Sequence, residues 1–504
     1  MNAKKEKYLE AIWYLAVFAF FYIWFSRVHP LIVYDADDWT YIAYVRKATP
    51  IWGEWNPAKV FPEVLMPFFS SIILHTITPL VGDYITGFTV GHALVVSGFI
   101  TAYVWCLVRT VRRSFSLSRL TGVLTGTLFL IFHFLIFRTE DSGNSYLFRC
   151  VDLNCYYNYL LPALLNACLM MYMMDRQHFD AFLTKASAAS LGIFYVVIYF
   201  AVFSNLVTSG ILAAYAGSCL LLNLLRVRKQ FKLNQYIREN TPWLVILTMW
   251  FISAIFELSG GRAAHAGSHS MIALLHEAAY CLKDVLFNCS PVFWLCVVVI
   301  TVLAALQYLL TREKAQDEAA VLQHFVVILV AGAALTFYML ALCAMVWTGN
   351  VYRSEYQFPL FFYGFLLVFL GLGYLLKKQP KLTVIMPLLL VFLASCINTS
   401  GKTFLDSHMT DVSASTCADI SRDIINQYLE ADAAGLETAT IYVPMHVTDP
   451  ETEDNWPHSA YLLPRVGGAL YEQGITSRHI YATIVADPSV NERFNIPLPT
   501  EPEE

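Results

Sequence analysis

The chain has 504 residues, of which 57% are hydrophobic and only 14% are charged, and its net charge is -5 at pH 7. A soluble domain of average composition carries about 25% charged residues, so solvated side chains cannot cover this surface. The composition excludes a soluble enzyme and a disordered protein, and the acidic balance argues against a nucleic-acid partner. It indicates a helical protein that crosses a membrane several times.

The N-terminus has the pattern of a signal peptide, with three lysines in the first seven residues and an apolar run from Tyr8 to about Phe25. Bulky residues and Arg27 follow the run, where a signal peptide would have a cleavage site of small residues. The run is also long enough to span the roughly 30 Å hydrocarbon core. We expect it to be a retained first membrane helix.

Apolar runs of membrane-spanning length predict eleven helices. They lie at about 8–28, 86–108, 120–137, 157–174, 186–203, 206–225, 242–257, 291–310, 322–347, 357–376 and 382–397. The stretch 58–80 is apolar too, but Pro62, Pro67 and Pro79 interrupt it. We expect an interfacial or re-entrant segment there.

Lysine and arginine set the orientation. They are concentrated in alternate connections: Arg109, Arg112, Arg113 and Arg119; Arg226, Arg228, Lys229 and Lys232; Lys377, Lys378 and Lys381. Basic loops stay in the cytoplasm, so the pattern predicts a multi-pass cell-membrane protein with a cytoplasmic N-terminus. The loops after the odd-numbered helices would then lie outside.

The tail after the last apolar run is too polar to span a membrane, and its pattern predicts structure. Residues Ala418–Leu429 and Ser459–Glu472 have the pattern of helices, and Thr438–Val443 and Ile480–Val485 have the pattern of strands. This order predicts a small extracytoplasmic α/β domain with a parallel strand pair over 398–504, beside a membrane domain over 1–397.

Two pairs of cysteines fall in expected outside loops. Cys150 and Cys155 share one loop, and Cys281 and Cys289 share another. Either pair could form a disulfide in an oxidising compartment or remain as free thiols.

The first outside loop contains three carboxylates, Asp35, Asp37 and Asp38, followed by Trp39 and Tyr41 as candidate substrate contacts. Close carboxylates repel one another, which raises the pKa of at least one of the three aspartates. Such an aspartate is a candidate general base for a hydroxyl nucleophile. The alternative is a solvated acidic turn that caps the next helix. The three could also hold a divalent cation, although hard-ion sites usually need more oxygen ligands. We expect no other metal or cofactor.

Arginines in the other outside loops run against the orientation bias. They are Arg138, Arg149, Arg262 and Arg353. A guanidinium binds phosphate through two parallel hydrogen bonds, so these residues are candidates for holding a lipid-linked phosphate. Snorkelling, or an ion pair such as Arg353 with Glu355, is the alternative. The neighbouring polar residues that we expect at a substrate site are Tyr157, Asn158, Tyr352 and Glu355.

This organisation resembles the GT-C superfamily of integral-membrane glycosyltransferases and, among the bacterial multi-span families related to it, the domain-of-unknown-function 6056 group. Ser259-Gly260-Gly261-Arg262 stands where that group has Pro-Gly-Asn-x-x-Arg; the Pro and the Asn are missing and the Arg is kept. The resemblance implies a GT-C-like fold and transfer of a sugar from a polyprenyl-phosphate donor to a hydroxyl of a cell-surface glycan, lipid or protein.

The resemblance also implies roles for individual residues. An aspartate of the first outside loop, Asp37 or Asp38, would act as the base in an inverting displacement. Arg149, Arg262 and Arg353 would hold the lipid phosphate. The alternative function is a polytopic transporter or flippase for a lipid-linked saccharide, which would be expected to place charges at mid-bilayer rather than at one face.

Overall fold

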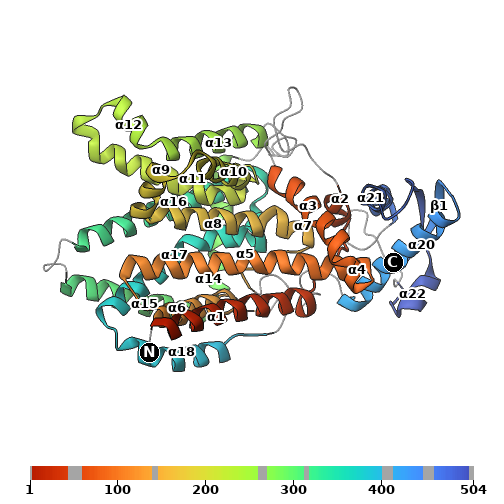
Figure 1. Ribbon diagram of the computed structural model, residues 1–504, viewed down its shortest axis with the longest axis horizontal. Helices are drawn as coiled ribbons and strands as arrows, with labels where there is room; N and C mark the ends of the chain where they lie inside the picture. The colour runs from red at the N-terminus through yellow and green to blue at the C-terminus, as the bar shows by residue number, and fades with distance from the viewer. Residues whose placement is uncertain are drawn as a thin grey trace.

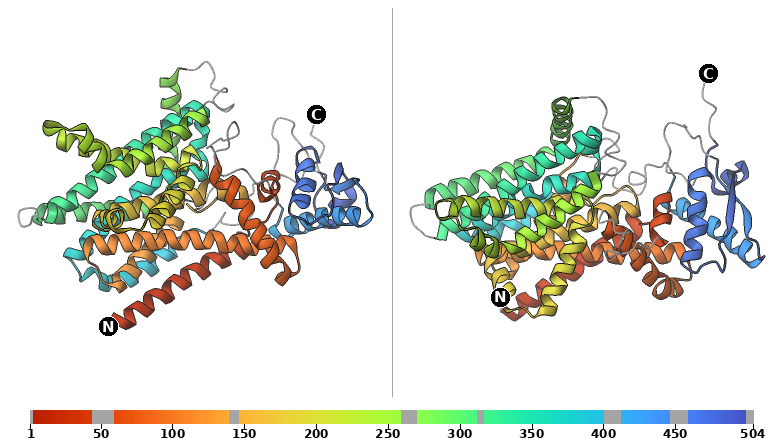
Figure 2. Two further views of the ribbon diagram at one scale, coloured as in Figure 1. Left: turned by 45° about the horizontal axis from the view of Figure 1, so that its top comes forward. Right: turned by 90° about the horizontal axis from the view of Figure 1, so that it is seen from above.

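The computed structural model describes residues 3–43, 59–138, 146–258, 270–311, 317–399, 412–445 and 459–498. Long helices run side by side in one bundle, and a small unit formed by the C-terminal residues lies at one end of it (Figures 1 and 2). The chain is a helical membrane protein by the length and composition of these helices.

In the described residues up to 227, the chain forms eleven α-helices. Their bounds are α1 Ala3–Ile23, α2 Ala36–Ala43, α3 Val60–Thr76, α4 Thr78–Val81, α5 Tyr84–Phe115, α6 Arg119–Leu135, α7 Leu153–Cys155, α8 Leu161–Met174, α9 Arg176–Lys185, α10 Ala188–Val202 and α11 Leu206–Val227. Short π-helical segments continue α1 over Trp24–Val28 (η1) and join α7 to α8 over Tyr156–Leu160 (η2).

The second half adds further helices and the only two strands found among the described residues. Their bounds are α12 Leu233–Glu239, α13 Thr241–Leu258, α14 Met271–Phe287, α15 Pro291–Thr311, α16 Asp317–Val346, α17 Ser354–Lys378, α18 Leu382–Ser395, α20 Ala414–Ala433, β1 Thr438–Val443, α21 Ser459–Glu472, β2 Tyr481–Ala486 and α22 Pro488–Phe494. Short 3-10 helices lie over Arg228–Gln230 (η3) and Thr348–Tyr352 (η5).

The expectation of about eleven membrane spans is wrong. Among the described residues, six helices are long and apolar enough to cross a membrane, or seven if α12 and α13, which meet at 83°, form one broken span. Helices α6, α10 and α18 have only 17, 15 and 14 residues. At 1.5 Å per residue they are about 21–26 Å long, which is less than the roughly 30 Å core. The hydropathy of the sequence reflects how many residues are apolar and does not indicate where a helix ends.

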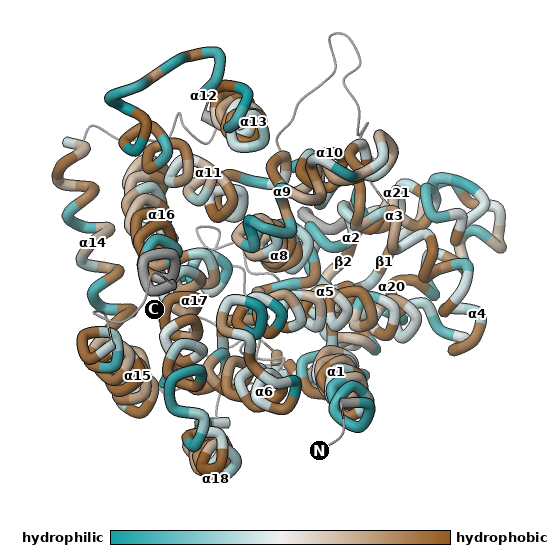
Figure 3. The backbone as a smooth tube through the Cα atoms, turned by 60° about the vertical axis from the view of Figure 1, so that its left-hand side comes forward, coloured by the Kyte–Doolittle hydropathy of each residue, from teal (hydrophilic) through white to brown (hydrophobic). Residues whose placement is uncertain are grey.

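Burial separates the helices of the interior from those at the rim. In α17, 83% of the most apolar window is buried, whereas in α15 the figure is 6%. Figure 3 shows the bundle nearly end-on, with α5, α8 and α17 inside and α14, α15 and α18 at the rim. The outward residues of α15, among them Leu295, Val298 and Leu306, are exposed, as lipid-facing side chains are.

The two ends of the bundle differ in charge. The N-terminus and α12 lie toward the left-hand end in Figure 1, and the C-terminal unit lies at the right-hand end. The basic last turns of α5 and α17 belong to the N-terminal end, since Arg112 pairs with Glu10 and Gln379 bonds to Gln307 at the end of α15. The acidic loop after η1 belongs to the opposite end.

The C-terminal unit comprises α20, β1, α21, β2 and α22. β1 and β2 pair in parallel, with Thr438 opposite Tyr481 and Val443 opposite Ala486. This two-stranded sheet is small, so the unit is mainly helical. It does not hang free as an appendage, because α21 packs directly on α2 of the bundle.

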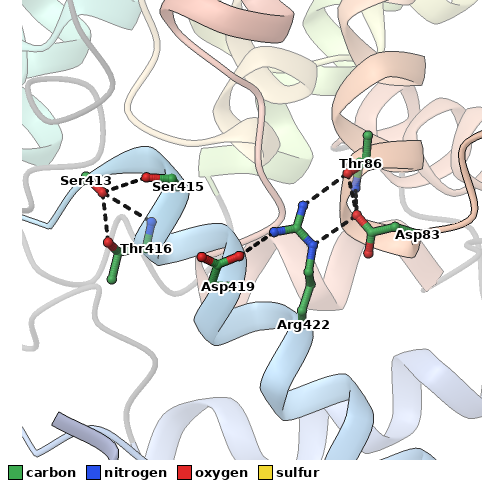
Figure 4. Close-up of polar contacts among 7 residues, drawn as sticks. All are labelled: Asp83, Thr86, Ser413, Ser415, Thr416, Asp419 and Arg422. Atoms are coloured by element: carbon green, nitrogen blue, oxygen red, sulfur yellow. Dashed lines mark hydrogen bonds and ion pairs between the residues drawn. The ribbon is translucent and has the colours of Figure 1, made fainter. Parts of the chain in front are cut away.

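Polar contacts fasten the C-terminal unit to the bundle. Figure 4 shows Arg422 of α20 pointing at the start of α5, where its Nε lies 3.0 Å from the Asp83 carboxylate and its Nη2 3.0 Å from the Thr86 hydroxyl. Ser421 also donates to the carbonyl of Val33, 3.1 Å away. The segment that leads into the acidic loop is therefore held by residues almost 400 positions later in the chain.

Candidate functional site

Asp38 is a fully buried carboxylate that fixes the acidic loop. Its Oδ2 accepts hydrogen bonds from the backbone N–H groups of Tyr34 and Asp35, each 3.2 Å long, and its Oδ1 accepts one of 2.6 Å from Asn154. Burial raises the pKa of Asp38 well above its usual value, and the charges of Asp152 and Asp35 add to the effect. Both oxygens are engaged by the backbone, so Asp38 holds two loops together.

Asp35 lies next to Asp38, and its carboxylate accepts fewer hydrogen bonds than that of Asp38. Its Oδ1 accepts the N–H of Asp37 at 2.7 Å, and its carbonyl accepts the N–H of Trp39 at 3.3 Å, so it begins helix α2. The residue is 5% exposed, and burial raises its pKa to about 6, with the charge of Asp37 adding to the rise. A carboxyl that titrates near neutrality is suited to accept a proton.

Asp37 is the outermost of the three and faces the C-terminal unit. Its side chain is 45% exposed and forms a 2.9 Å ion pair with Arg465 of α21. The third carboxylate of the loop therefore binds the helix that packs on α2.

Asp152, which was not among the candidates from the sequence, adds a third buried carboxylate near Asp35 and Asp38. It caps the short helix α7 by accepting the N–H of Cys155 at 2.6 Å. Burial raises its pKa to about 8, and the negative charges of Asp35 and Glu355 raise it further. The only sequence signal was an aspartate three residues after Arg149, and nothing in the sequence linked that loop to Asp35.

Arg149 is the buried cation of the site. It is 5% exposed, and its Nε is buried without an acceptor. Within the described ranges its guanidinium forms no hydrogen bond and no ion pair. Removing an unpaired charge from water is costly, so this arrangement favours binding of an anion at this point.

Tyr146 and Tyr156, which both interact electrostatically with Arg149, are held by a histidine. His29, just past η1, contacts the hydroxyl of Tyr146 through Nδ1 and that of Tyr156 through Nε2, the latter at 3.4 Å. Trp24 donates to the same Tyr146 hydroxyl at 3.4 Å. The sequence analysis missed His29, although an ionisable residue beside Pro30 at the end of the first apolar run was a usable signal.

Arg353 and Glu355 form the ion pair that was one of the two expected alternatives. Their Nε and Oε2 atoms are 3.4 Å apart, with the Glu355 side chain fully buried and that of Arg353 38% exposed. Arg353 also lies over the ring of Tyr159, 5.7 Å from its centre. Glu355 accepts the N–H of Val151 at 3.4 Å, which brings the start of α17 to the loop that carries Arg149 and Asp152.

Other candidate residues have different surroundings. Tyr157 donates or accepts a 2.8 Å bond with His92 of α5, and Asn158 bonds to Asn154 within its own helix. Arg138 is exposed, and its backbone N–H bonds to the carbonyl of Asn288, so it lies at the junction of α14 and α15.

The remaining candidates divide by burial. Trp39 is buried, Tyr352 is 39% exposed, and the hydroxyl of Tyr41 accepts from Lys59 Nζ at 3.3 Å. Arg262 and the Ser259-Gly260-Gly261 run before it lie outside the described residues. Of the three arginines predicted to share one phosphate, the described residues therefore include Arg149 and Arg353 but not Arg262.

In the part of the chain that the structure describes, no three His, Cys, Asp or Glu side chains are arranged to hold a metal ion. The hydrogen bonds explain this, because Asp38 accepts three N–H groups and Asp37 pairs with Arg465.

The two cysteine pairs do not form disulfides in the structure. Cys150, Cys155, Cys281 and Cys289 are all free thiols.

No family model, curated protein or solved structure matches the chain. The fold and composition define a multi-helix membrane protein with a polar site at one end of its bundle, and the function has to be argued from that site.

Proposed function

We propose that the protein is a membrane glycosyltransferase that moves a sugar from a polyprenyl-phosphate donor to an acceptor hydroxyl. The observation that carries the proposal is Arg149: an almost fully buried guanidinium without a carboxylate partner in the described structure. It lies in the loop that also carries Asp152 and that is hydrogen-bonded to Asp38 and Glu355. A phosphate would supply the missing negative charge, and the neighbouring acids supply a base.

Asp35 is the best candidate for that base. Asp38 is occupied by three backbone N–H groups, and Asp37 is paired with Arg465, whereas Asp35 has a pKa of about 6 and so loses its proton near neutral pH. The resemblance pointed first to Asp37 or Asp38. The hydrogen-bond pattern favours their neighbour.

The reaction is a single displacement. The acceptor O–H gives its proton to the Asp35 carboxylate while its oxygen forms a bond to the anomeric carbon of the sugar. The bond between that carbon and the phosphate oxygen breaks, and its electron pair leaves with the polyprenyl phosphate. Arg149 stabilises the charge that develops on this oxygen, an effect worth several kcal/mol, about 2.7–4 for one well-placed donor.

The proposal places the site on the outer face. The N-terminus and the basic ends of α5 and α17 gather at one end of the bundle, which supports a cytoplasmic assignment for that end. The acids and Arg149 lie at the other end, where a lipid phosphate in the outer leaflet can reach them while its tail stays between lipids.

The test is transfer from a labelled donor by the purified, reconstituted chain. A panel of polyprenyl-phosphate sugars is offered, and release of polyprenyl phosphate is measured together with labelled product. We expect turnover with at least one donor, and its loss in Arg149→Ala but not in the control Arg27→Ala, which removes an exposed arginine. Passage of the intact donor across the vesicle membrane without cleavage would show a flippase and overturn the proposal.

A further inference from the structure

A second polar pocket lies at the opposite end of the bundle, between α1, α5 and α6. The cavity has a volume of about 420 Å³. Its charged lining residues are Lys7, Glu10, Arg109, Arg112, Arg113 and Arg119. The glycosyltransferase proposal does not use this pocket.

The positive charges outnumber their partners. Glu10 is shared by Arg112, at 2.5 Å, and Arg119. Arg113 pairs with Asp175 at 3.0 Å. Lys7 and Arg109 have no carboxylate partner among the described residues. The pocket therefore keeps a net positive charge that an anion would neutralise.

Two guanidinium groups are placed so that hydrogen-bond donors remain available. The guanidinium carbon of Arg109 lies 5.4 Å from the ring centres of both Trp105 and Tyr172, and these contacts use its faces rather than its N–H groups. Nε of Arg112 is buried without an acceptor. Such a set of donors suits the oxygens of a phosphate.

General rules for basic residues explain only part of the pocket. Arg112 and Arg113 stand in the last turn of α5, where the helix dipole favours cations. Lys7 lies near the start of α1, where the dipole opposes a cation, and Arg109 lies nearly two turns before the end of α5. The positive-inside bias explains why basic residues occur at the N-terminal end of the bundle, but it does not explain why they line one cavity.

The surroundings of the pocket indicate a lipid. Trp105 lines the cavity and is still 46% exposed, and on α1 the side chains of Tyr8, Ile12 and Leu15 are exposed as well. In a membrane protein these faces contact acyl chains, and Trp and Tyr prefer the depth of the headgroups. Basic pockets between membrane helices on the cytoplasmic side bind anionic headgroups.

We propose that this pocket binds the phosphodiester headgroup of an anionic phospholipid, with its acyl chains along the exposed apolar faces of α1 and α5. Arg109 and Lys7 contact the phosphate, while Glu10 keeps Arg112 and Arg119 in place. The proposal is independent of the reaction at the other end of the bundle.

The test uses the full chain, reconstituted in phosphatidylcholine with or without phosphatidylglycerol. Native mass spectrometry measures which lipid is retained, and thermal unfolding measures stabilisation. We expect preferential retention of phosphatidylglycerol, and we expect the double variant Lys7→Gln with Arg109→Gln to weaken it about tenfold or more. The matched control is Arg228→Gln with Lys229→Gln, which removes two charges from the exposed η3 at the same end.

Three results would overturn the proposal: equal retention of both lipids, equal losses in the test and control variants, or full stabilisation by glycerol phosphate alone, which would indicate a soluble anion. Should the double variant fold poorly, Arg109→Lys keeps the charge but loses the flat stacking group. We then expect Arg109→Lys to retain less phosphatidylglycerol than the native chain, and no change at all would count against the pocket.

Discussion

Asp38 accepts a 2.6 Å hydrogen bond from the backbone N–H of Asn154, a residue 116 positions further along the chain. This bond joins the loop that carries Asp35 to the loop that carries Arg149 and Asp152. The position of the proposed base Asp35 relative to the proposed phosphate ligand Arg149 therefore depends on Asp38. In the proposed reaction, Asp38 itself neither accepts the proton nor binds the phosphate.

The first prediction concerns that bond. Asp38→Asn replaces one acceptor oxygen by an NH₂ group that faces backbone N–H donors, leaving a buried donor unsatisfied at a cost of about 1–3 kcal/mol. We expect a lower midpoint of thermal unfolding and reduced turnover together. An inactive Asp38→Asn protein with native stability would instead mean that Asp38 contacts the reacting groups.

The second prediction is a pH profile. Asp35 must be deprotonated to act as a base, so we expect activity to rise with pH around a midpoint near 6, the pKa that burial gives it. Asp35→Asn should remove this activity, with a loss of about 10²–10⁴-fold. Rates that do not change between pH 5 and 7 would assign the base to another group.

The same carboxyl makes stability depend on pH in the opposite direction. The pKa of Asp35 is raised from 3.8 to about 6 in the folded chain, so the folded state holds the proton more tightly than the unfolded state. Its contribution to folding is greatest below pH 3.8 and is lost as the pH rises through 6. As the pH rises from 4 to 6, the midpoint of thermal unfolding of Asp35→Asn should therefore increase relative to that of the native chain.

The fourth prediction separates binding from folding at Arg149. An unpaired buried cation lowers stability, so Arg149→Met, which keeps an unbranched apolar stem without the charge, should fold at least as stably as the native chain while losing donor binding. Arg149→Lys keeps the charge without the planar fork and should retain part of the binding. Unfolding of Arg149→Met would show that the guanidinium is structural.

The fifth prediction addresses Asp37 and Arg465. Their ion pair is partly exposed, so a double-mutant cycle with Ala at each position should give a coupling energy of about 1 kcal/mol or less. Activity should survive both changes. Loss of activity in Asp37→Ala alone would return the catalytic role to Asp37.

Sequence patterns located the acidic loop, Arg149 and the pair of Arg353 with Glu355, because carboxylates and arginines beside apolar runs stand out. The same patterns could not show that Asp38 faces inward or that Asp152 joins it, since both depend on how α6 and α7 return to the first loop. They also gave too many spans, because apolar residues continue past the ends of short helices such as α10 and α18.

Helix α5 has 32 residues and is therefore about 48 Å long, well above the roughly 30 Å of hydrocarbon that it crosses. With an average tilt of about 20° the excess is still about 15 Å, to be shared between its two ends. The turn with Asp83 and Thr86, which holds Arg422, then stands at or above headgroup level rather than among acyl chains. For the proposed glycosyltransferase, an acceptor can approach that platform from the aqueous side, so a long hydrophilic glycan would be as suitable a substrate as a lipid.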